Sequence, residues 1–408
     1  MFDTILSGDY PKSKVLNTVL LAIFFGLALG PFLFDGAVAF STITNICIFI
    51  VLVASYDILL GYTHIVSLAH TMFYGIGAYA VAIAMNSMGP SWGSMFVGVI
   101  GGVLVAAVIA LLVGLLSLRV KALFFALVTL AVAVGFGILI SKFYAITGGE
   151  QGLGFRPPRE LGPGFKLFEE RWYGFNALGW LWNLVTDPGN LGENTKQAVF
   201  DVRMSGRIVL YYVIFLTTVG LFLLMLRMMN SPFGRVLKAV RENEFRAEAL
   251  GYRTVMFRTI NVVIAGAIAA LAGAMAAMSD PWVTPDSYLS LGVMVNILLM
   301  CVIGGMGTLY GAMVGATIFI LAETYLKDFM EVAYDLTAGF FNALPEWLSW
   351  LSFIHELISP DRWYFWMGLL FVLSVYFFPA GVVGQFRAKE LESQIADSEE
   401  GASRTEPA

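Results

Sequence analysis

The sequence predicts an all-α polytopic membrane protein with about ten transmembrane helices, some of them broken or re-entrant. Hydrophobic residues make up 58% of the 408 residues, and charged residues only 13%. The apolar residues gather in runs of about 20, the length at which a helix crosses a bilayer. Lys and Arg gather in several short connections, which places those connections on the cytoplasmic side.

The first half of the chain contains five predicted spans after a short cytoplasmic N-terminus, residues 1–14. Arg119 and Lys121 place the connection before the fifth span in the cytoplasm. Polar residues begin the third span, and this predicts a broken or re-entrant start. Irregular backbone at membrane depth must be shielded by protein or line a cavity. The five spans are residues 15–34, 38–60, 65–85, 95–118 and 123–145.

A polar segment at residues 147–206 follows, and it is far longer than an ordinary connection. Its basic and acidic residues are nearly balanced, which suits the outer side of the membrane. Several aromatic residues suit an interfacial layer: Trp172, Tyr173, Trp180 and Trp182.

The second half contains five further predicted spans and completes a membrane domain at residues 15–389. A cytoplasmic segment, residues 231–256, follows the first of these spans, and a second outer segment, residues 327–361, precedes the last. Residues 390–408 form an acidic tail that we expect to be disordered. Both termini are expected in the cytoplasm. The five spans are residues 208–229, 257–278, 289–303, 309–322 and 363–378.

The cytoplasmic segment is a charged island in an apolar chain. Pro232 suits the first turn of a helix and Gly251 the end of one. Asn243 and Glu244 interrupt the helical pattern, which predicts two short helices or a kink. An apolar face favours a docking element for a cytoplasmic partner over a solvated loop that only sets topology. This face contains Val236, Ala239, Val240, Ala247 and Leu250.

Little in the sequence indicates catalysis or nucleotide binding. There is no G-x-x-x-x-G-K-[ST] phosphate loop, so we expect no ATP site of that kind in this chain. The chain has three histidines and no H-E-x-x-H motif, so we expect no metal site. Residues 89–93 match the letters G-x-S-x-G but lie between two predicted membrane helices, where the required strand is absent. We therefore expect no catalytic residue and no cofactor in this chain.

Few charged residues lie in or at the ends of the predicted spans: Asp57, Lys142 and Glu323. Asp57 lies near the inner boundary, where it either caps a helix or takes part in transport. Lys142 and Glu323 lie near the outer ends, where an interfacial role is expected. A proton- or sodium-coupled carrier usually has a deeper carboxylate. The energy for any transport is therefore expected to come from elsewhere.

Five blocks of sequence occur in order between residues 40 and 320, and together they form a specific pattern. They are Leu59–Tyr79, Leu123–Leu130, Thr147–Gly152, the charged island and Ile303–Gly311. The chain resembles the permease subunits of branched-chain amino acid type ABC importers, closest to the LivM-type subunit. Two departures from the pattern are Asp57, where these proteins commonly have an uncharged amide, and Ala69, where they commonly have Gly.

The resemblance implies a permease that forms the translocation pathway for branched-chain or other small amino acids. It implies a location in the bilayer of a bacterial plasma (inner) membrane, as a multi-pass protein. The implied partners are a second related permease subunit, two cytoplasmic ATPases that bind ATP and Mg, and an extracytoplasmic binding protein that delivers substrate. No nucleic acid is expected as a partner.

The resemblance also places the charged island at the ATPases as a coupling segment. The residues expected there are Arg235, Lys238, Arg241, Glu242, Asn243, Glu244, Glu248 and Gly251. Polar or Gly-rich parts of broken spans are expected to line the pathway: Ser67, His70, Thr71, Tyr74, Asn296 and Thr308. For His70 the alternative is a hydrogen bond between packed helices. The pairs Gly98/Gly102 and Gly311/Gly315 are expected to be packing contacts.

Two alternatives stay open. The same type of importer could carry urea, short amides or small organic and aromatic acids, because selectivity in such a system depends largely on the partner that binds the substrate. The chain could instead be a stand-alone channel or secondary carrier, in which the charged island is only a topology signal. Co-purifying ATPases would distinguish the importer from the channel or carrier.

Overall fold

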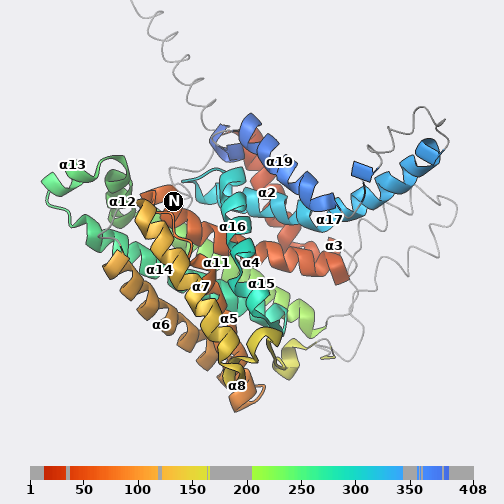
Figure 1. The fold of residues 1–408 in the computed structure, drawn as a ribbon, viewed down its shortest axis with the longest axis horizontal. Helices are drawn as coiled ribbons and strands as arrows, with labels where there is room; N and C mark the ends of the chain where they lie inside the picture. Colours follow the sequence, from red (N-terminus) through yellow and green to blue (C-terminus); the bar gives the residue numbers. More distant parts are fainter. Residues whose placement is uncertain are drawn as a thin grey trace, which may run out of the picture.

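The computed structural model describes residues 13–33, 37–117, 122–162, 164–165, 205–342, 356–357, 359, 362–378 and 381–385. Within these residues the chain is almost entirely helical (Figure 1). Seven helical segments are long and apolar enough to cross a membrane. They are α4 (Ala37–Thr63), α6 (Trp92–Ser117), α7 (Ala122–Lys142), α11 (Gly206–Asn230), α14 (Thr254–Ser279), α15 with α16 (Pro285–Leu289 and Leu291–Gly304), and α17 (Leu309–Asn342).

Three further helices occupy the remaining predicted spans: α2 (Lys14–Ala28), α5 (His70–Met88) and α19 (Trp363–Phe377). Two of them, α2 and α19, have only 15 residues each, and α5 is less apolar because polar residues begin it. The expectation of about ten spans therefore stays a prediction. So does the cytoplasmic location of both termini, because residues 1–12 and 386–408, including the acidic tail, lie outside the described residues.

The irregular entry into α5 falls where polar residues predicted it. Residues 64–69 are not helical and lead from α4 into α5. The backbone also breaks at Ser290, which caps α16 by accepting a hydrogen bond from the N–H of Val293. The α17 helix differs from expectation, since it continues without interruption past Ala322 to Asn342. No proline occurs in that stretch to stop it.

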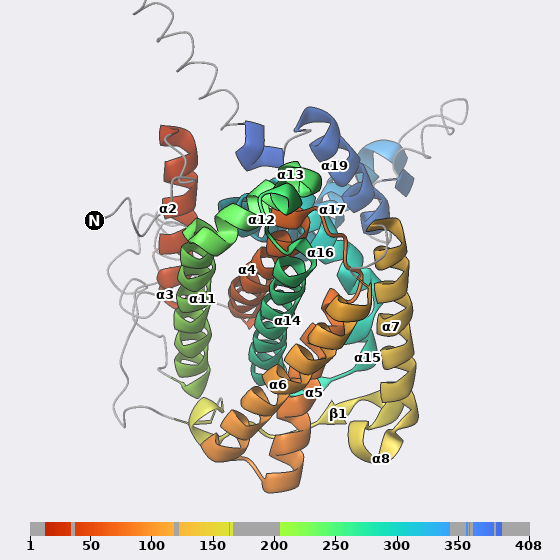
Figure 2. The ribbon, with the colours of Figure 1, turned by 90° about the vertical axis from the view of Figure 1, so that its left-hand side faces the viewer.

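The α14 helix lies at the centre of the bundle and packs against α4, α5 and α6 (Figure 2). Glycine residues, which have no side chain, let the helix backbones approach closely at these contacts. A Cβ added to Gly77 would overlap the carbonyl oxygen of Ala270, and one added to Gly273 would overlap that of Tyr74. The backbones of α5 and α14 therefore touch directly, as small residues allow between membrane helices.

The two Gly-x-x-x-Gly pairs make packing contacts, as predicted. A Cβ added to Gly98 would lie 2.7 Å from the Cα of Val81, and one added to Gly102 would lie 2.9 Å from the Cβ of Ala80. A Cβ added to Gly315 would overlap a backbone oxygen of α16. These glycines therefore hold α5 against α6 and α16 against α17.

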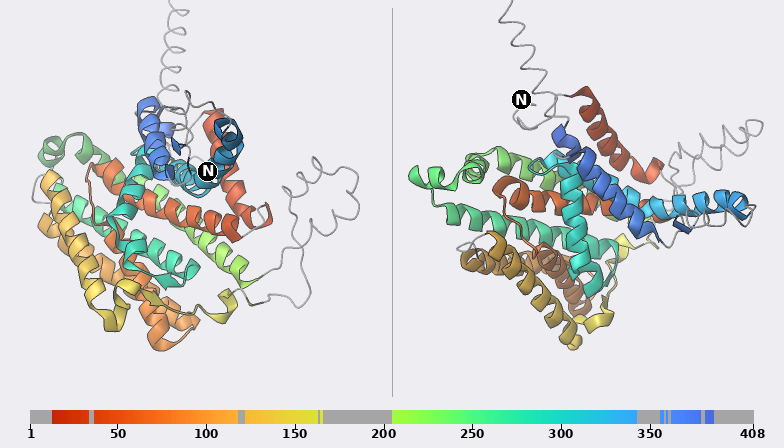
Figure 3. Two further views of the ribbon diagram at one scale, coloured as in Figure 1. Left: turned by 45° about the vertical axis from the view of Figure 1, so that its right-hand side comes forward. Right: turned by 45° about the horizontal axis from the view of Figure 1, so that its top comes forward.

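The two ends of the bundle carry different short elements (Figure 2). At one end are α8 (Tyr144–Thr147), η1 (Gly149–Gln151), η2 (Arg159–Leu161) and a two-stranded antiparallel sheet. Its strands, β1 (Leu153–Gly154) and β2 (Trp282–Val283), pair Leu153 with Val283. The other end carries the charged island. Figure 3 (right) shows the green segment that contains it projecting at the edge of the molecule.

Candidate functional site

The charged island folds into two short helices, as its pattern predicted. These are α12 (Pro232–Glu242) and α13 (Glu244–Ala249). Asn243 separates them, and its Oδ1 accepts a hydrogen bond from the backbone N–H of Arg246 at 2.9 Å. Asn243 is therefore the N-cap of α13. Gly251 follows α13 with a φ of 91°, a conformation that glycine adopts without strain.

One stripe of α12 is buried against α11 and α4. It consists of Gly234, Leu237 and Val240, spaced three residues apart. Two members of the apolar face that the sequence indicated, Ala239 and Leu250, are exposed. Ala239 is exposed because it lies about 200° around the helix from Leu237. Leu250 is exposed because it follows α13, which begins anew after the break at Asn243.

Two cations of α12 contact the C-terminal end of α4. Arg241 donates a hydrogen bond from Nη1 to the carbonyl oxygen of Gly61 and another from Nε to Nε2 of His64, at 3.0 Å. One turn earlier, Nζ of Lys238 lies 5.4 Å from the centre of the Tyr62 ring, a cation–π contact. These contacts fasten the last turns of α12 to the last turn of α4.

His64 is held in an unusual conformation at this contact. Its φ of 52° lies in the left-handed region, which few residues other than glycine adopt. Nε2 can accept the hydrogen bond from Arg241 only when it carries no proton. Partial burial, and then the positive charge of Arg241, lower the pKa of His64 below its ordinary value. The environment therefore favours the neutral ring that the contact requires.

The second helix of the island is held to the start of α14. Glu244 forms an ion pair with Arg258, with Oε1 and Nη1 2.6 Å apart. Oε1 of Glu248 accepts a hydrogen bond from the Thr254 hydroxyl at 2.8 Å. Five of the predicted coupling residues therefore make contacts within the chain that fix the direction of α12 and α13: Lys238, Arg241, Asn243, Glu244 and Glu248.

Large apolar side chains of the island face outward instead. Phe245 is 85% exposed and Leu250 is 73% exposed. Phe245 was not among the predicted coupling residues, whereas Leu250 belonged to the apolar face that predicted a docking element. A usable signal was present in the sequence, because Phe245 is a large apolar residue flanked by charged ones. Exposed polar neighbours complete this surface: Arg235, Glu242 and Arg246. We call the seven residues from Glu244 to Leu250 the tip.

Four of the six predicted pathway residues lie together where the chain enters α5. Ser67, His70, Thr71 and Tyr74 are all buried. His70 forms a hydrogen bond through Nε2 with Oγ of Ser55 at 2.9 Å, which is the packing alternative raised for this residue. The ring of Tyr74 stacks on Tyr288, with centroids 5.1 Å apart. Within the described chain these groups are enclosed by neighbouring helices.

The other two predicted pathway residues lie elsewhere. Asn296 is half-buried on α16. Thr308 is buried in the connection between α16 and α17, where its hydroxyl donates a hydrogen bond to the carbonyl oxygen of Gly305 at 2.9 Å. The structure therefore does not join all six residues into one lining. Their role in a pathway stays a prediction.

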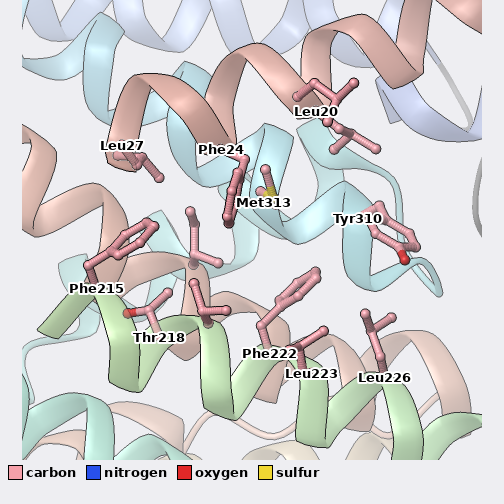
Figure 4. Close-up of a pocket in the computed structure, with 13 residues that line it drawn as sticks. Leu20, Phe24, Leu27, Phe215, Thr218, Phe222, Leu223, Leu226, Tyr310 and Met313 are labelled. Carbon is pink, nitrogen blue, oxygen red and sulfur yellow. The ribbon is translucent and has the colours of Figure 1, made fainter. Parts of the chain in front are cut away.

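Two apolar cavities flank α2. The first, of about 250 Å³, lies between α2, α11 and the start of α17 (Figure 4). Phe24, Phe215, Phe222 and Met313 are among the residues that line it. The second, of about 430 Å³, lies on the side of α2 that faces α4 and the middle of α17. Neither cavity includes a predicted pathway residue, and their hydrocarbon walls suit an apolar occupant such as an acyl chain.

No group of three or more His, Cys, Asp or Glu side chains within the described ranges is placed to hold a metal ion. Cys47 and Cys301 are both buried and unpaired by any disulfide.

Comparison with known proteins gives a consistent result. A family described as the permease component of the branched-chain amino acid transport system matches residues 38–375. The high-affinity branched-chain amino acid transport permease LivM of Salmonella typhimurium is 26% identical over 346 residues, which cover 84% of this chain and 75% of the relative. LivM of Escherichia coli K12 is 26% identical over 345 residues, with the same coverage. LivH of Salmonella typhimurium is 23% identical over 315 residues, covering 76% of this chain and 89% of the relative. No solved structure matches the chain.

Proposed function

The chain belongs to the family of permease components of branched-chain amino acid transport systems, and from this premise we propose that it forms the translocation pathway of an ATP-driven importer. The proposed substrates are branched-chain or other small amino acids, the class that the names of its relatives state for those proteins. The proposed location is the inner membrane of a bacterium. Seven helical segments that can cross a membrane support a multi-pass protein.

The proposed partners follow from the same family. The chain resembles both LivM and LivH relatives, and this supports pairing with a second, related permease. Two cytoplasmic ATPases would supply the energy by binding ATP and Mg, and an extracytoplasmic binding protein would deliver the substrate. The part of this chain in the proposal is to form the pathway and receive the movement of the ATPases.

The observation that supports the proposal best is the arrangement of the charged island. Arg241 binds the end of α4, and Glu244 binds the start of α14, so the tip is braced from two sides. Phe245 and Leu250 nevertheless remain exposed. A loop that only set topology would need neither the braces nor the exposed apolar groups. A rigid projection with two apolar side chains suits insertion into a groove on another protein.

Force applied to the tip would reach the membrane helices through these braces. Closure of the ATPase dimer would shift α12 and α13, and α4 and α14 would follow because they are bonded to them. ATP can shift the chain between inward-open and outward-open states only by as much as the ATPases contact the two states differently.

Affinity purification from native membranes, followed by mass spectrometry, tests the proposal. We expect two ATPases and a second permease to co-purify with the chain, and to be lost from an Arg241→Ala, Glu244→Ala double variant that still inserts into the membrane. ATP-dependent uptake of radiolabelled leucine by the reconstituted complex, with urea, acetamide and benzoate as competitors, then identifies the substrate class. A chain that purifies alone and moves solute without ATP would instead be a channel or carrier.

A further inference from the structure

We propose that Asp57 is a positioning residue that links the charged island to the connection between α16 and α17. The link consists of Asp57 and Gly61 on α4, Gly307 in that connection, and Arg241 on α12. It joins three segments that are far apart in the sequence. The inference rests on the proposed function, because it states how movement received by α12 reaches α16 and α17.

The first contact of the link joins α4 to the connection. Oδ1 of Asp57 accepts a hydrogen bond from the backbone N–H of Gly307 at 2.7 Å. The thiol of Cys301, on the last turn of α16, lies 3.5 Å from the same oxygen. Asp57 is 1% exposed, so water does not compete for these contacts. A charged acceptor makes such a hydrogen bond stronger than a neutral one.

The second contact joins Arg241 to Gly61 and Gly307. Arg241 donates to the carbonyl oxygen of Gly61, and a Cβ added to Gly307 would lie only 2.8 Å from Nη1 of Arg241. A Cβ added to Gly61 would overlap both Asp57 Oδ1 and the backbone nitrogen of Gly307. The guanidinium, the two glycine backbones and the carboxylate are therefore stacked in direct contact.

The conformation of Gly307 explains why this arrangement requires glycine. Its φ of 82° lies in the left-handed region, which turns the N–H toward α4. The tight connection continues at Thr308, whose hydroxyl bonds back to Gly305. A pull on Gly307 is therefore passed to the ends of both α16 and α17.

Asp57 is poorly explained as a simple stabilising residue. Its second oxygen, Oδ2, is buried and makes no hydrogen bond with any described residue. Burying a carboxylate with half of its acceptor capacity unused costs stability, and neutral groups could hold Gly307 at lower cost. Among the described residues Asp57 forms no ion pair within 4 Å, and its carboxylate and the Arg241 guanidinium contact the same two glycines, Gly61 and Gly307. A carboxylate beside the contacts of Arg241 suits a link that fixes the position of α12 relative to the connection between α16 and α17.

Spin labels on the two linked segments test the contact directly. Glu242→Cys and Met306→Cys give label sites beside Arg241 and Gly307, and both native residues are exposed while the native cysteines are buried. In the full chain in lipid nanodiscs, the distance between the labels should be narrowly distributed. Asp57→Ala should broaden the distribution, and Asp57→Asn, which keeps an acceptor for the Gly307 N–H but loses the negative charge, should broaden it less. An unchanged distribution in Asp57→Ala overturns the inference.

Thr218→Val is the matched control. The Thr218 hydroxyl donates a hydrogen bond from α11 to the carbonyl oxygen of Cys47 on α4 at 3.1 Å, so this variant also removes a buried contact between helices, but outside the link. It should lose some thermal stability and leave the label distance narrow. Broadening in Thr218→Val equal to that in Asp57→Ala would mean that the labels report general loosening, and would overturn the inference.

Reconstituted unlabelled complexes test the transmission of movement. In Asp57→Ala the ATPases should still co-purify and hydrolyse ATP, while the amount of substrate moved per ATP falls by about fivefold or more. A merely structural role would lower assembly and hydrolysis in step with uptake. An unchanged ratio would overturn the transmission. Failure of the wild-type chain to bind ATPases would refute the proposed function and the transmission, while the label distances would still decide whether Asp57 holds the connection.

Discussion

The carboxylate of Glu244 and the guanidinium of Arg258 lie 2.6 Å apart and join the first residue of α13 to the first turns of α14. Both side chains are partly exposed, Glu244 to 39% and Arg258 to 19%. Exposed ion pairs contribute at most about 1 kcal/mol to stability. We therefore expect this ion pair to orient α13 and to contribute little to the free energy of unfolding.

Glu244→Gln should weaken ATPase binding severalfold and lower the free energy of unfolding by less than about 1 kcal/mol. The neutral amide of Gln cannot form the ion pair with Arg258, so α13 is held less firmly and the tip must become ordered when the ATPase binds. Titration of purified ATPase against the chain in nanodiscs measures the affinity. A charge-swapped Glu244→Arg, Arg258→Glu variant should recover part of the loss. Arg362→Gln, which removes the exposed pair with Glu356 at 2.8 Å, should leave binding unchanged. Full affinity in Glu244→Gln would show that the pair does not orient the tip.

Phe245→Ala and Leu250→Ala should each reduce ATPase affinity by about tenfold, the effect of losing a large apolar contact at an interface. Neither change should affect folding, because the side chains are 85% and 73% exposed in the isolated chain. Leu336→Ala is the matched control, since Leu336 is 83% exposed on α17, away from the tip. The same titration measures all three variants. An equal loss of ATPase affinity in Leu336→Ala, or no loss in Phe245→Ala and Leu250→Ala, would show that the tip does not contact the ATPase.

Gly273→Ala should destabilise the helix bundle by about 1–3 kcal/mol, because the added methyl would overlap the carbonyl oxygen of Tyr74 and push α14 away from α5. Gly101→Ala on α6 is the control, since a Cβ there meets no atom within 4 Å. It should be neutral or slightly stabilising. Thermal unfolding in detergent compares the two. Equal melting temperatures would show that the contact between the two backbones is not tight.

The pKa of His64 should lie below its ordinary value, and Arg241→Ala should raise it. The pKa is measured from the imidazole NMR signals of His64 as a function of pH, and these signals are assigned by their loss in a His64→Gln variant. The folded chain binds this proton less tightly than the unfolded chain does. The stability contributed by neutral His64 is therefore fully present above the ordinary pKa and is lost as the pH falls toward the lowered one. Acidification should also break the hydrogen bond from Arg241. A pKa that does not respond to Arg241→Ala would contradict the contact between the two side chains.

Local features of the fold could be predicted because short-range rules determine them. The break at Asn243, the helix start at Pro232 and the positive φ of Gly251 each follow from the residue itself and its immediate neighbours. The irregular start of α5 followed from its polar residues. The end of α17 was missed because polar and apolar residues alternate there without a proline or a capping residue to mark a stop.

The functional residues were harder to predict, because charge in the sequence does not say which partner a side chain meets. The resemblance placed Arg241, Glu244 and Glu248 in a coupling segment at the ATPases, and the structure shows each of them bonded within the chain. Phe245 was not predicted, because a single aromatic residue adds nothing to a periodic apolar pattern; its place among charged residues was the signal that could have identified it. Whether any of these residues contacts an ATPase stays a prediction.

The sequence by itself determined the helical membrane class, the position of the charged island and the family. Hydropathy, charge and motif order are properties of the linear chain, so they need no knowledge of contacts. Only the tertiary structure decided that Asp57, Gly61, Arg241 and Gly307 meet at one point. Their contacts join residues up to 250 positions apart, and such contacts depend on how whole helices pack rather than on the local sequence.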